Sequence, residues 1–218
     1  MIDLVNKYKF SFILYGLVLL TGIVLAFSIP KLELHQLINN SHTEFQDWLF
    51  RTITWLGDGW FAVIFSIFFL LIRFRYFFML ILSFSISGLL TQFFKRVVFP
   101  DILRPSAFLD QMSDLSLVSG INLYQSFSFP SGHTTTAFAV LLLAGFILER
   151  KGGFFLAMIL ALLTGFSRVY LSQHFLVDIL AGSVIGTLSA LFFYWYFRSL
   201  KHEWLDLSIQ NVFRGRKR

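Results

Sequence analysis

The sequence has 218 residues, of which 56% are hydrophobic and only 14% are charged, whereas soluble domains carry about 25% charged residues. It contains no cysteine, which excludes thiolate nucleophiles, disulfides and cysteine-ligated metals. The formal net charge is +6, but five of the 18 Lys and Arg fall in the last eighteen residues, so we interpret the excess as a membrane-topology signal rather than a nucleic-acid-binding surface.

Long apolar segments predict an all-α integral membrane protein with six transmembrane helices in a single membrane domain, residues 1–218. A spanning helix needs about 20 apolar residues. The second and fourth segments are short, and we expect each to add a turn from adjoining polar residues. The first segment is too long for a cleaved signal peptide and is expected to stay as an anchor. The predicted helices cover about residues 10–29, 58–72, 76–95, 131–149, 154–171 and 178–198.

The basic residues predict the orientation of these helices. With a cytoplasmic N-terminus, twelve Lys and Arg lie on the cytoplasmic side and six on the other, as the positive-inside rule favours. Both termini are then cytoplasmic, and residues 199–218 form a basic cytoplasmic tail. The loops 30–58, 95–130 and 172–177 face outward.

The first outward loop has its own helical pattern. Phe45, Trp48, Leu49 and Ile53 follow a spacing of three and four, which gives one mainly apolar helical face. This pattern predicts an interfacial helix anchored by aromatic side chains such as Trp48. An ordinary helix packed over the bundle explains the pattern equally well.

Polar residues, most of them ionisable, gather at the expected outward ends of helices three to six and in the adjoining loops. Charged groups at membrane depth are costly and usually mark function. Any one of them alone is explained as an interface residue, but all of them on one membrane face are not. The set is Lys95, Arg96, Arg104, Ser131, His133, Arg168, His174 and Asp178.

The stretch "SRVYLSQHFLVD" (167–178) carries three of these groups. His174 and Asp178 are four residues apart, so on a helix they share a face. A carboxylate that binds one imidazole nitrogen fixes the tautomer and leaves the other nitrogen free as a base or nucleophile. Arg168 offers a planar fork of donors that suits phosphate oxygens. A structural His–Asp cap at the start of helix six is the alternative.

The stretch "PSGH" (130–133) starts the fourth helix. Serine is a preferred N-cap, and the free N–H groups of a helix start bind anions. Gly132 lets the backbone approach a ligand closely. Ser131, Gly132 and His133 therefore suggest half of a phosphate cradle, with His133 aimed at the bound group. A plain helix N-terminus explains the proline and the serine well and the histidine poorly.

The stretch "KRVVFPDILRP" (95–105) adds basic residues to the same face. Lys95 or Arg96 ends helix three, and Arg104 precedes Pro105. Basic groups at a helix end also complement the helix dipole, which is the structural alternative.

Taken in order, these three stretches resemble the type 2 phosphatidic acid phosphatase family, integral membrane lipid phosphatases related to vanadium haloperoxidases. The family motifs Pro-Ser-Gly-His and Ser-Arg-x5-His-x3-Asp match fully at residues 130–133 and 167–178. The first motif departs, because the family has Lys-x6-Arg-Pro whereas eight residues separate Lys95 from Arg104. Arg96 is therefore a rival for the first basic position. The resemblance covers about residues 88–198, the expected catalytic core.

The resemblance implies a role for each matching residue. His174 is the expected nucleophile, which forms a phosphohistidine, and Asp178 orients it. His133 is expected to protonate the leaving lipid oxygen and then to activate water. No metal or other cofactor is implied. The groups expected to hold the phosphate oxygens are Lys95, Arg104 and Arg168, with the backbone around Ser131 and Gly132.

The sequence thus predicts a lipid phosphatase in a bacterial inner (plasma) membrane, with its site facing the periplasm or exterior. The expected substrate is a phosphomonoester or diphosphate of a lipid: undecaprenyl diphosphate, phosphatidylglycerol phosphate, phosphatidic acid or a lipid A phosphate. The sequence defines neither the particular lipid nor the oligomeric state, and no nucleic acid is expected as a partner. A lipid phosphotransferase would use the same residues. A transporter of anionic substrates would need polar residues along helices four and six, which are nearly uncharged beyond their outer turns.

Overall fold

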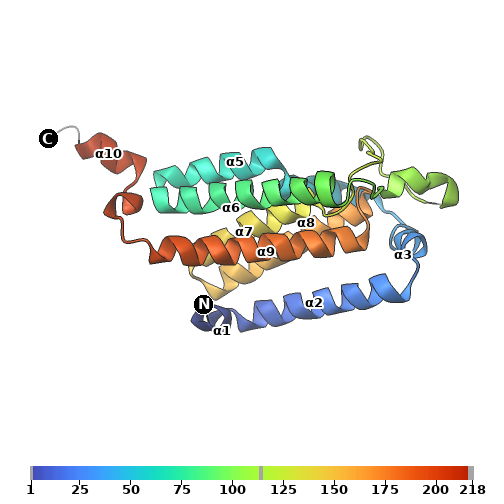
Figure 1. Cartoon of the computed structure of the whole chain (residues 1–218), viewed down its shortest axis with the longest axis horizontal. Coiled ribbons are helices and arrows are strands. Elements are labelled where there is room, and N and C mark those ends of the chain that lie inside the picture. The colour runs from blue at the N-terminus through green and yellow to red at the C-terminus, as the bar shows by residue number, and fades with distance from the viewer. Residues whose placement is uncertain (1, 113–114, 216–218) are drawn as a thin grey trace.

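The computed structural model describes residues 2–112 and 115–215, and within these ranges every regular element is a helix (Figure 1). The long helices run side by side along one axis. The short helices α1 (Ile2–Lys7) and α10 (Ile209–Gly215) lie at one end of the bundle, and α3 (Lys31–Ile38) lies at the other (Figure 1). The two ends of the described chain therefore share one side of the bundle.

Each of the six predicted helices has a counterpart within a few residues of its predicted bounds. A 3₁₀ turn, Phe69–Leu71, continues α5, and a π turn, Phe94–Val98, continues α6. The counterparts are α2 (Lys9–Ser28), α5 (Gly59–Phe68), α6 (Phe74–Phe93), α7 (Gly132–Leu148), α8 (Lys151–Tyr170) and α9 (Leu176–Ser199).

The number of membrane spans is four or five by length and composition within the described residues, rather than the predicted six. The four clear spans are α2, α6 with its π turn, α8 and α9. The stretch Glu44–Gly57 and the stretch Gly59–Leu71 form a fifth candidate, bent by 60°. Helix α7 has 17 residues and a length of about 26 Å at 1.5 Å per residue. It falls short of the hydrocarbon thickness of about 30 Å.

Helix α7 is the centre of the bundle, which explains why its length does not have to match the bilayer. It packs against α6, α8 and α9, and every residue from Thr134 to Phe146 is buried. The contact with α9 is very close. A Cβ atom added at Gly186 would lie 2.5 Å from the carbonyl oxygen of Thr135, and one at Gly182 would lie 2.6 Å from that of Ser131. Two glycines spaced by four thus let the two backbones meet.

The loop between α2 and α5, which the sequence predicts to face outward, contains the expected helix, α4 (Glu44–Ile53), which continues into a 3₁₀ turn, Thr54–Gly57. Phe45 and Trp48 are 67% and 62% exposed. Phe50, on the opposite side, is buried with its ring centroid 4.5 Å from that of Tyr170. The helix therefore combines a packing contact with an exposed aromatic face, as the two sequence interpretations require.

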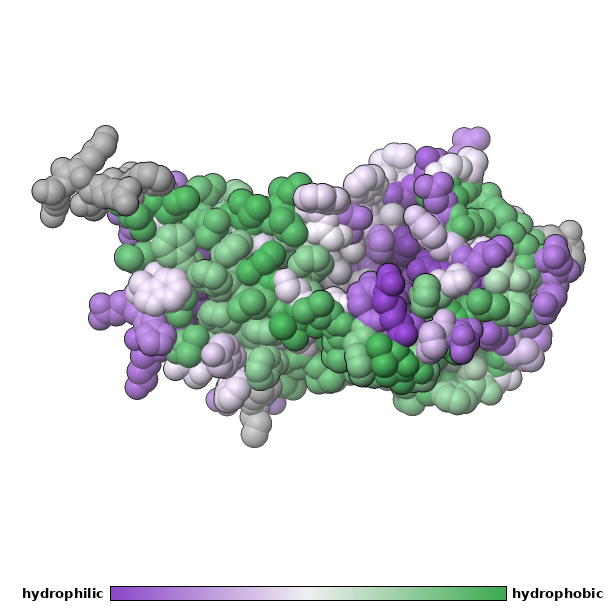
Figure 2. Space-filling model, turned by 45° about the horizontal axis from the view of Figure 1, so that its top comes forward, coloured by the Kyte–Doolittle hydropathy of each residue, from purple (hydrophilic) through white to green (hydrophobic). Residues whose placement is uncertain are grey.

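The surface follows the same plan. Figure 2 shows hydrophobic side chains over the middle of the molecule and hydrophilic side chains gathered toward its ends.

At the end that carries α10, all three nitrogens of the Arg75 guanidinium donate hydrogen bonds, and Nη2 lies 2.7 Å from Asp206 Oδ2. This ion pair ties the start of the predicted basic tail to α6. Residues 216–218 of that tail lie outside the described residues.

Candidate active site

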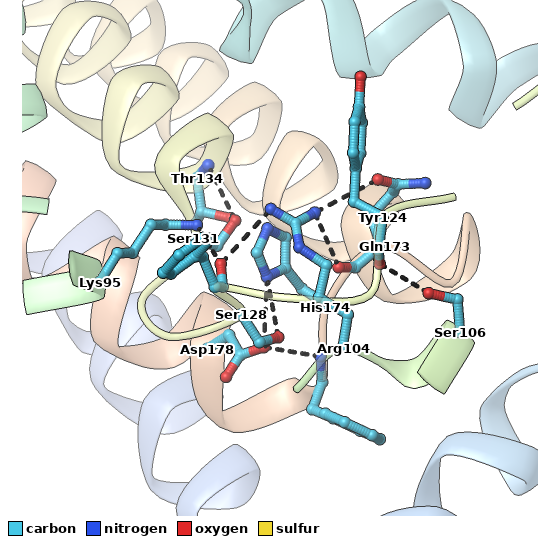
Figure 3. Close-up of polar contacts among 12 residues, drawn as sticks. Lys95, Arg104, Ser106, Tyr124, Ser128, Ser131, Thr134, Gln173, His174 and Asp178 are labelled. Carbon is cyan, nitrogen blue, oxygen red and sulfur yellow. Dashed lines mark hydrogen bonds and ion pairs between the residues drawn. The ribbon is translucent and has the colours of Figure 1, made fainter. Parts of the chain in front are cut away.

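Segments that are far apart in the sequence meet at the end of the bundle opposite α10, and Figure 3 shows the polar contacts among their side chains. Backbone hydrogen bonds also join them. The amide of Arg104 donates to the carbonyl of Gln125 at 2.8 Å, and the amide of Ser128 donates to that of Ile102 at 2.9 Å. The amide of Ser131 donates to the carbonyl of Asp178 at 3.0 Å. The start of α7 is thereby fixed to the start of α9.

His174 and Asp178 form a buried pair. Nδ1 of His174 lies 3.2 Å from Oδ2 of Asp178, and their side chains are 2% and 1% exposed. The same oxygen accepts hydrogen bonds from the Ser128 hydroxyl and from the Phe175 amide, the latter at 3.0 Å. Both side-chain hydrogen-bond contacts of the ring are made by Nδ1, with Ser128 and Asp178, and Nε2 has no side-chain partner among the described residues.

The charge state of His174 follows from its surroundings. Burial, and then the positive charges of Lys95, Arg104 and Arg168, lower the pKa of His174 well below its ordinary value. The imidazole is therefore neutral near pH 7, and a neutral ring whose Nδ1–H points to a carboxylate keeps a lone pair on Nε2.

His133 occupies the first turn of α7. Ser131 caps this helix, since its Oγ accepts from the amide of Thr134 at 3.4 Å and from the hydroxyl of Thr134 at 2.9 Å. His133 lies within electrostatic range of the cations Arg168, Arg104 and Lys95. The turn before α5 packs closely against the main chain of His133. A Cβ atom added at Gly57 would lie only 2.5 Å from the His133 carbonyl oxygen.

Lys95 and Arg96 point in different directions. Lys95 lies on the π turn and is 5% exposed, and its Nζ donates to the carbonyl of Phe127 at 2.8 Å. Arg96 is exposed and donates to Gln92 at 3.2 Å. Lys95 therefore faces the pocket, although the spacing of the first motif left both residues open.

The two arginines approach from different sides. Nε of Arg104 donates to the carbonyl of Ser126 at 2.9 Å, and Nη1 lies 3.3 Å from the carbonyl oxygen of Gln173. Burial lowers the pKa of Arg104. Nη1 of Arg168 donates to the hydroxyl of Thr54 at 2.8 Å, whereas its buried Nε has no hydrogen-bond partner among the described residues. An incompletely bonded buried guanidinium is unusual and suits an anionic ligand.

All the site residues predicted from the sequence therefore come together at one end of the bundle. Sequence reasoning missed Ser128, Gln173, Thr54 and Gly57, which contact Asp178, Arg104, Arg168 and His133 in turn. Ser128 lies two residues before the Pro-Ser-Gly-His motif, and Gln173 occupies a variable position inside the motif at 167–178. These positions were the available signal. Within the described ranges, no group of three or more His, Asp or Glu side chains is placed to hold a metal ion.

Comparison with known proteins adds independent information. A profile described as the PAP2 superfamily matches residues 74–201, more than half of the chain. The chain is 39% identical over 82 residues to the bacitracin transport permease protein BcrC of Bacillus licheniformis, a match that covers 37% of this chain and 39% of the relative. It is 40% identical over 83 residues to the undecaprenyl-diphosphatase BcrC of Bacillus subtilis (strain 168), covering 38% of this chain and 42% of that protein. The matches thus span less than half the length of these curated relatives.

A solved structure shows the same fold over nearly the whole chain. The first transmembrane PAP2 type phosphatidylglycerolphosphate phosphatase from Bacillus subtilis superposes with a TM-score of 0.67 at 23% identity, covering 93% of this chain and 99% of that one.

The described residues thus form an all-helical bundle of membrane-spanning length, with a cationic pocket around two histidines at one end, as expected of an integral membrane protein that binds an anion. The chain belongs to the PAP2 superfamily.

Proposed function

We propose that the protein hydrolyses a phosphomonoester or diphosphate of a membrane lipid through a phosphohistidine formed at Nε2 of His174. One observation carries this proposal: Nδ1 of the buried His174 is held 3.2 Å from Asp178, while the cations Lys95, Arg104 and Arg168 surround the ring closely enough to act on it. This arrangement supports a neutral nucleophile in a pocket whose positive charge suits a phosphate.

The reaction has two steps. Nε2 of His174 attacks phosphorus, and the bond from phosphorus to the leaving oxygen breaks; this is the lipid alcohol oxygen of a monoester or the bridging oxygen of a diphosphate. His133, protonated while the bound phosphate offsets the surrounding cations, gives its proton to that oxygen. His133 then takes a proton from water, whose oxygen attacks the phosphohistidine and releases inorganic phosphate. Lys95, Arg104 and Arg168 offset the charge on the phosphoryl oxygens in both steps, which is the part that electrostatic stabilisation plays in phosphoryl transfer.

The substrate is a lipid whose phosphate reaches the outer face of a bacterial inner membrane. The similarity to an undecaprenyl-diphosphatase, and the fold shared with a phosphatidylglycerolphosphate phosphatase, support lipid diphosphates and phosphomonoesters as candidates. The excess of basic residues on the side predicted to be cytoplasmic supports an outward-facing site.

The test is phosphate release by the purified protein from undecaprenyl diphosphate, phosphatidylglycerol phosphate, phosphatidic acid and a lipid A phosphate. We expect His174→Ala to lower kcat/KM on every accepted lipid by about a thousandfold or more, since a covalent nucleophile is lost. His202→Ala, which changes an exposed histidine after α9, is the control and should behave as wild type. Acid-labile phosphate should appear on the wild-type protein after quenching and not on His174→Ala. Hydrolysis retained by His174→Ala would refute the nucleophile.

A further inference from the structure

A buried polar network outside the proposed catalytic residues joins the outward loop after α2 to the segment that carries His174. We call it the α3 clamp and define it as His35, Asn39, His42 and Asp47. The side chains of His35 and Asn39 are 2% and 0% exposed. Because burying a polar group costs free energy unless it is hydrogen-bonded, such a network is expected to have a positional role.

The inner half of the α3 clamp binds main chain and hydroxyl groups. Nδ2 of Asn39 donates to the carbonyl of Val169 at 3.2 Å and to that of His35 at 3.0 Å. Nε2 of His35 lies 3.1 Å from Oγ of Ser172. The His35 ring also meets the Phe175 ring edge-on, with centroids 5.4 Å apart.

The outer half of the clamp holds Tyr170. The hydroxyl of Tyr170 donates to Oδ1 of Asp47 at 2.6 Å, and the His42 ring stacks on the Tyr170 ring with centroids 4.1 Å apart. Nε2 of His42 lies 3.3 Å from Oδ1 of Asn39, so the two halves form one continuous network.

The turn within the segment 169–175 depends on these contacts because residues 171–175 lie between two helices. Helix α8 ends at Tyr170 and α9 begins at Leu176. Ser172 adopts a left-handed φ of 52°, which is strained for a residue with a side chain. The amides of Gln173 and His174 both donate to the carbonyl of Arg168. His174 therefore sits on a tight turn between two helices. The clamp contacts three residues before His174 (Val169, Tyr170 and Ser172) and one residue after it (Phe175).

We infer that His35 and Asn39 are positioning residues, which hold the 169–175 turn so that Nε2 of His174 is aimed at the phosphorus atom. The inference rests on the proposed function of His174. Neither residue belongs to the motifs matched in the sequence, and both act on the nucleophile through its neighbours. Because a misplacement of about 1 Å in a reacting group costs about a hundredfold in rate, loosening this turn should slow attack on phosphorus. It should leave the binding of phosphate by the cations almost unchanged.

The experiment compares Asn39→Ala and His35→Ala with the matched control Asn40→Ala, which changes the exposed neighbouring asparagine. Steady-state hydrolysis is measured on the best lipid of the substrate panel. We expect kcat to fall about 10- to 100-fold in the two clamp variants, with KM changed by less than about twofold. Asn40→Ala should match wild type. His35→Gln, which keeps a polar group for Ser172, should recover part of the lost kcat.

Two inhibitors separate positioning from a general loss of structure. Vanadate bonds to the attacking nitrogen and takes the five-coordinate geometry of the transition state, whereas inorganic phosphate binds to the cations alone. The clamp variants should therefore lose affinity for vanadate by about the factor that kcat loses, and should keep their affinity for phosphate within about twofold. Inhibition constants for both anions are measured on the folded fraction, isolated by size-exclusion chromatography in detergent.

The outcomes are distinct. Wild-type kcat in Asn39→Ala, or equal losses of phosphate and vanadate affinity, would overturn the positioning role. If His174→Ala stays active, the proposed nucleophile fails whatever the clamp variants do. If His174→Ala is inactive while both clamp variants behave as wild type, the nucleophile stands and the positioning role alone is wrong.

Discussion

Asp178 makes three contacts through a single carboxylate oxygen, Oδ2, which faces Ser128, the amide of Phe175 and His174. Two fixed donors leave this oxygen little freedom, so the carboxylate presents one orientation to the imidazole. The His–Asp pair is thus also the cap of α9, which means that the structural interpretation of these residues and the functional one describe the same contacts. A cap that holds a neutral imidazole is well suited to keep its tautomer fixed during a reaction.

Lys95 and Arg96 provide a residue-scale test with adjacent cations. Lys95→Ala should lower kcat/KM about a hundredfold or more, because it removes a buried positive charge from the pocket around the phosphate. Arg96→Ala should change it by less than about twofold, since Arg96 is exposed and bonds to Gln92. The measurement is phosphate release by purified variants at several lipid concentrations. Equal losses in the two variants would contradict the assignment of Lys95 to the pocket.

At the scale of elements, the site depends on how closely α7 and α9 pack. Gly182 and Gly186 bring the α9 backbone against α7. The hydrogen bond from the Ser131 amide to the Asp178 carbonyl lies at the end of the same interface that carries the candidate site. His133, at the start of α7, and Asp178, which holds His174 at the start of α9, therefore lie at one close contact between the two helices. A change in the spacing of these helices would move both residues.

Gly186→Ala tests this packing. An added Cβ would lie 2.5 Å from the Thr135 carbonyl oxygen and 2.6 Å from Cβ of Phe138, and neither atom belongs to a flexible side-chain end. We expect overpacking to cost about 1–3 kcal/mol and to lower the apparent Tm in detergent. Gly88→Ala in α6 is the control, because nothing lies within 4 Å of its added Cβ. An unchanged Tm in Gly186→Ala would show that the two helices can separate freely.

At the scale of the whole molecule, two buried neutral histidines couple folding to pH. Burial lowers the pKa of His35 to about 4 and that of His174 well below its ordinary value. The unfolded chain binds protons on these rings near pH 6.5, while the folded chain does not. The stability contributed by keeping these two rings neutral is therefore full above about pH 6.5 and is lost as the pH falls.

The share of His35 in this loss can be measured. The loss in free energy of unfolding caused by protonation of His35 should reach about 3 kcal/mol near pH 4. Below that pH the folded protein also takes up the proton, and the loss stops growing. Thermal melts of wild type and His35→Gln in detergent between pH 7.5 and pH 4.5, each normalised to its value at pH 7.5, give the comparison. The wild-type apparent Tm should fall more steeply toward acid than that of His35→Gln. Parallel curves would mean that His35 is not held neutral in the folded protein.

Much of this architecture could be predicted from the sequence, because apolar segments have the length of helices and the catalytic motifs are local. His174 and Asp178 are four residues apart, and helical spacing predicted that they lie close together. In the structure His174 precedes α9, and the capping carboxylate of Asp178 reaches back to it. The contacts of His35 with Ser172 and of Thr54 with Arg168 join residues more than 100 positions apart, and no periodic pattern reports such pairs. The spacing of the first motif left Lys95 and Arg96 as alternatives. Helical periodicity could not decide between them, because the π turn at the end of α6 changes the angle between successive residues.

The hydrogen bond between the Ser131 amide and the Asp178 carbonyl has a consequence for the order of events in catalysis. Because it ties the turn bearing His133 to the helix start that holds His174, we expect the two imidazoles to keep their separation while the leaving group of the proposed reaction departs. The proposed second half-reaction then needs only an exchange of small molecules beside His133. We expect water and other hydroxyl compounds that enter this space to compete for the phosphoryl group.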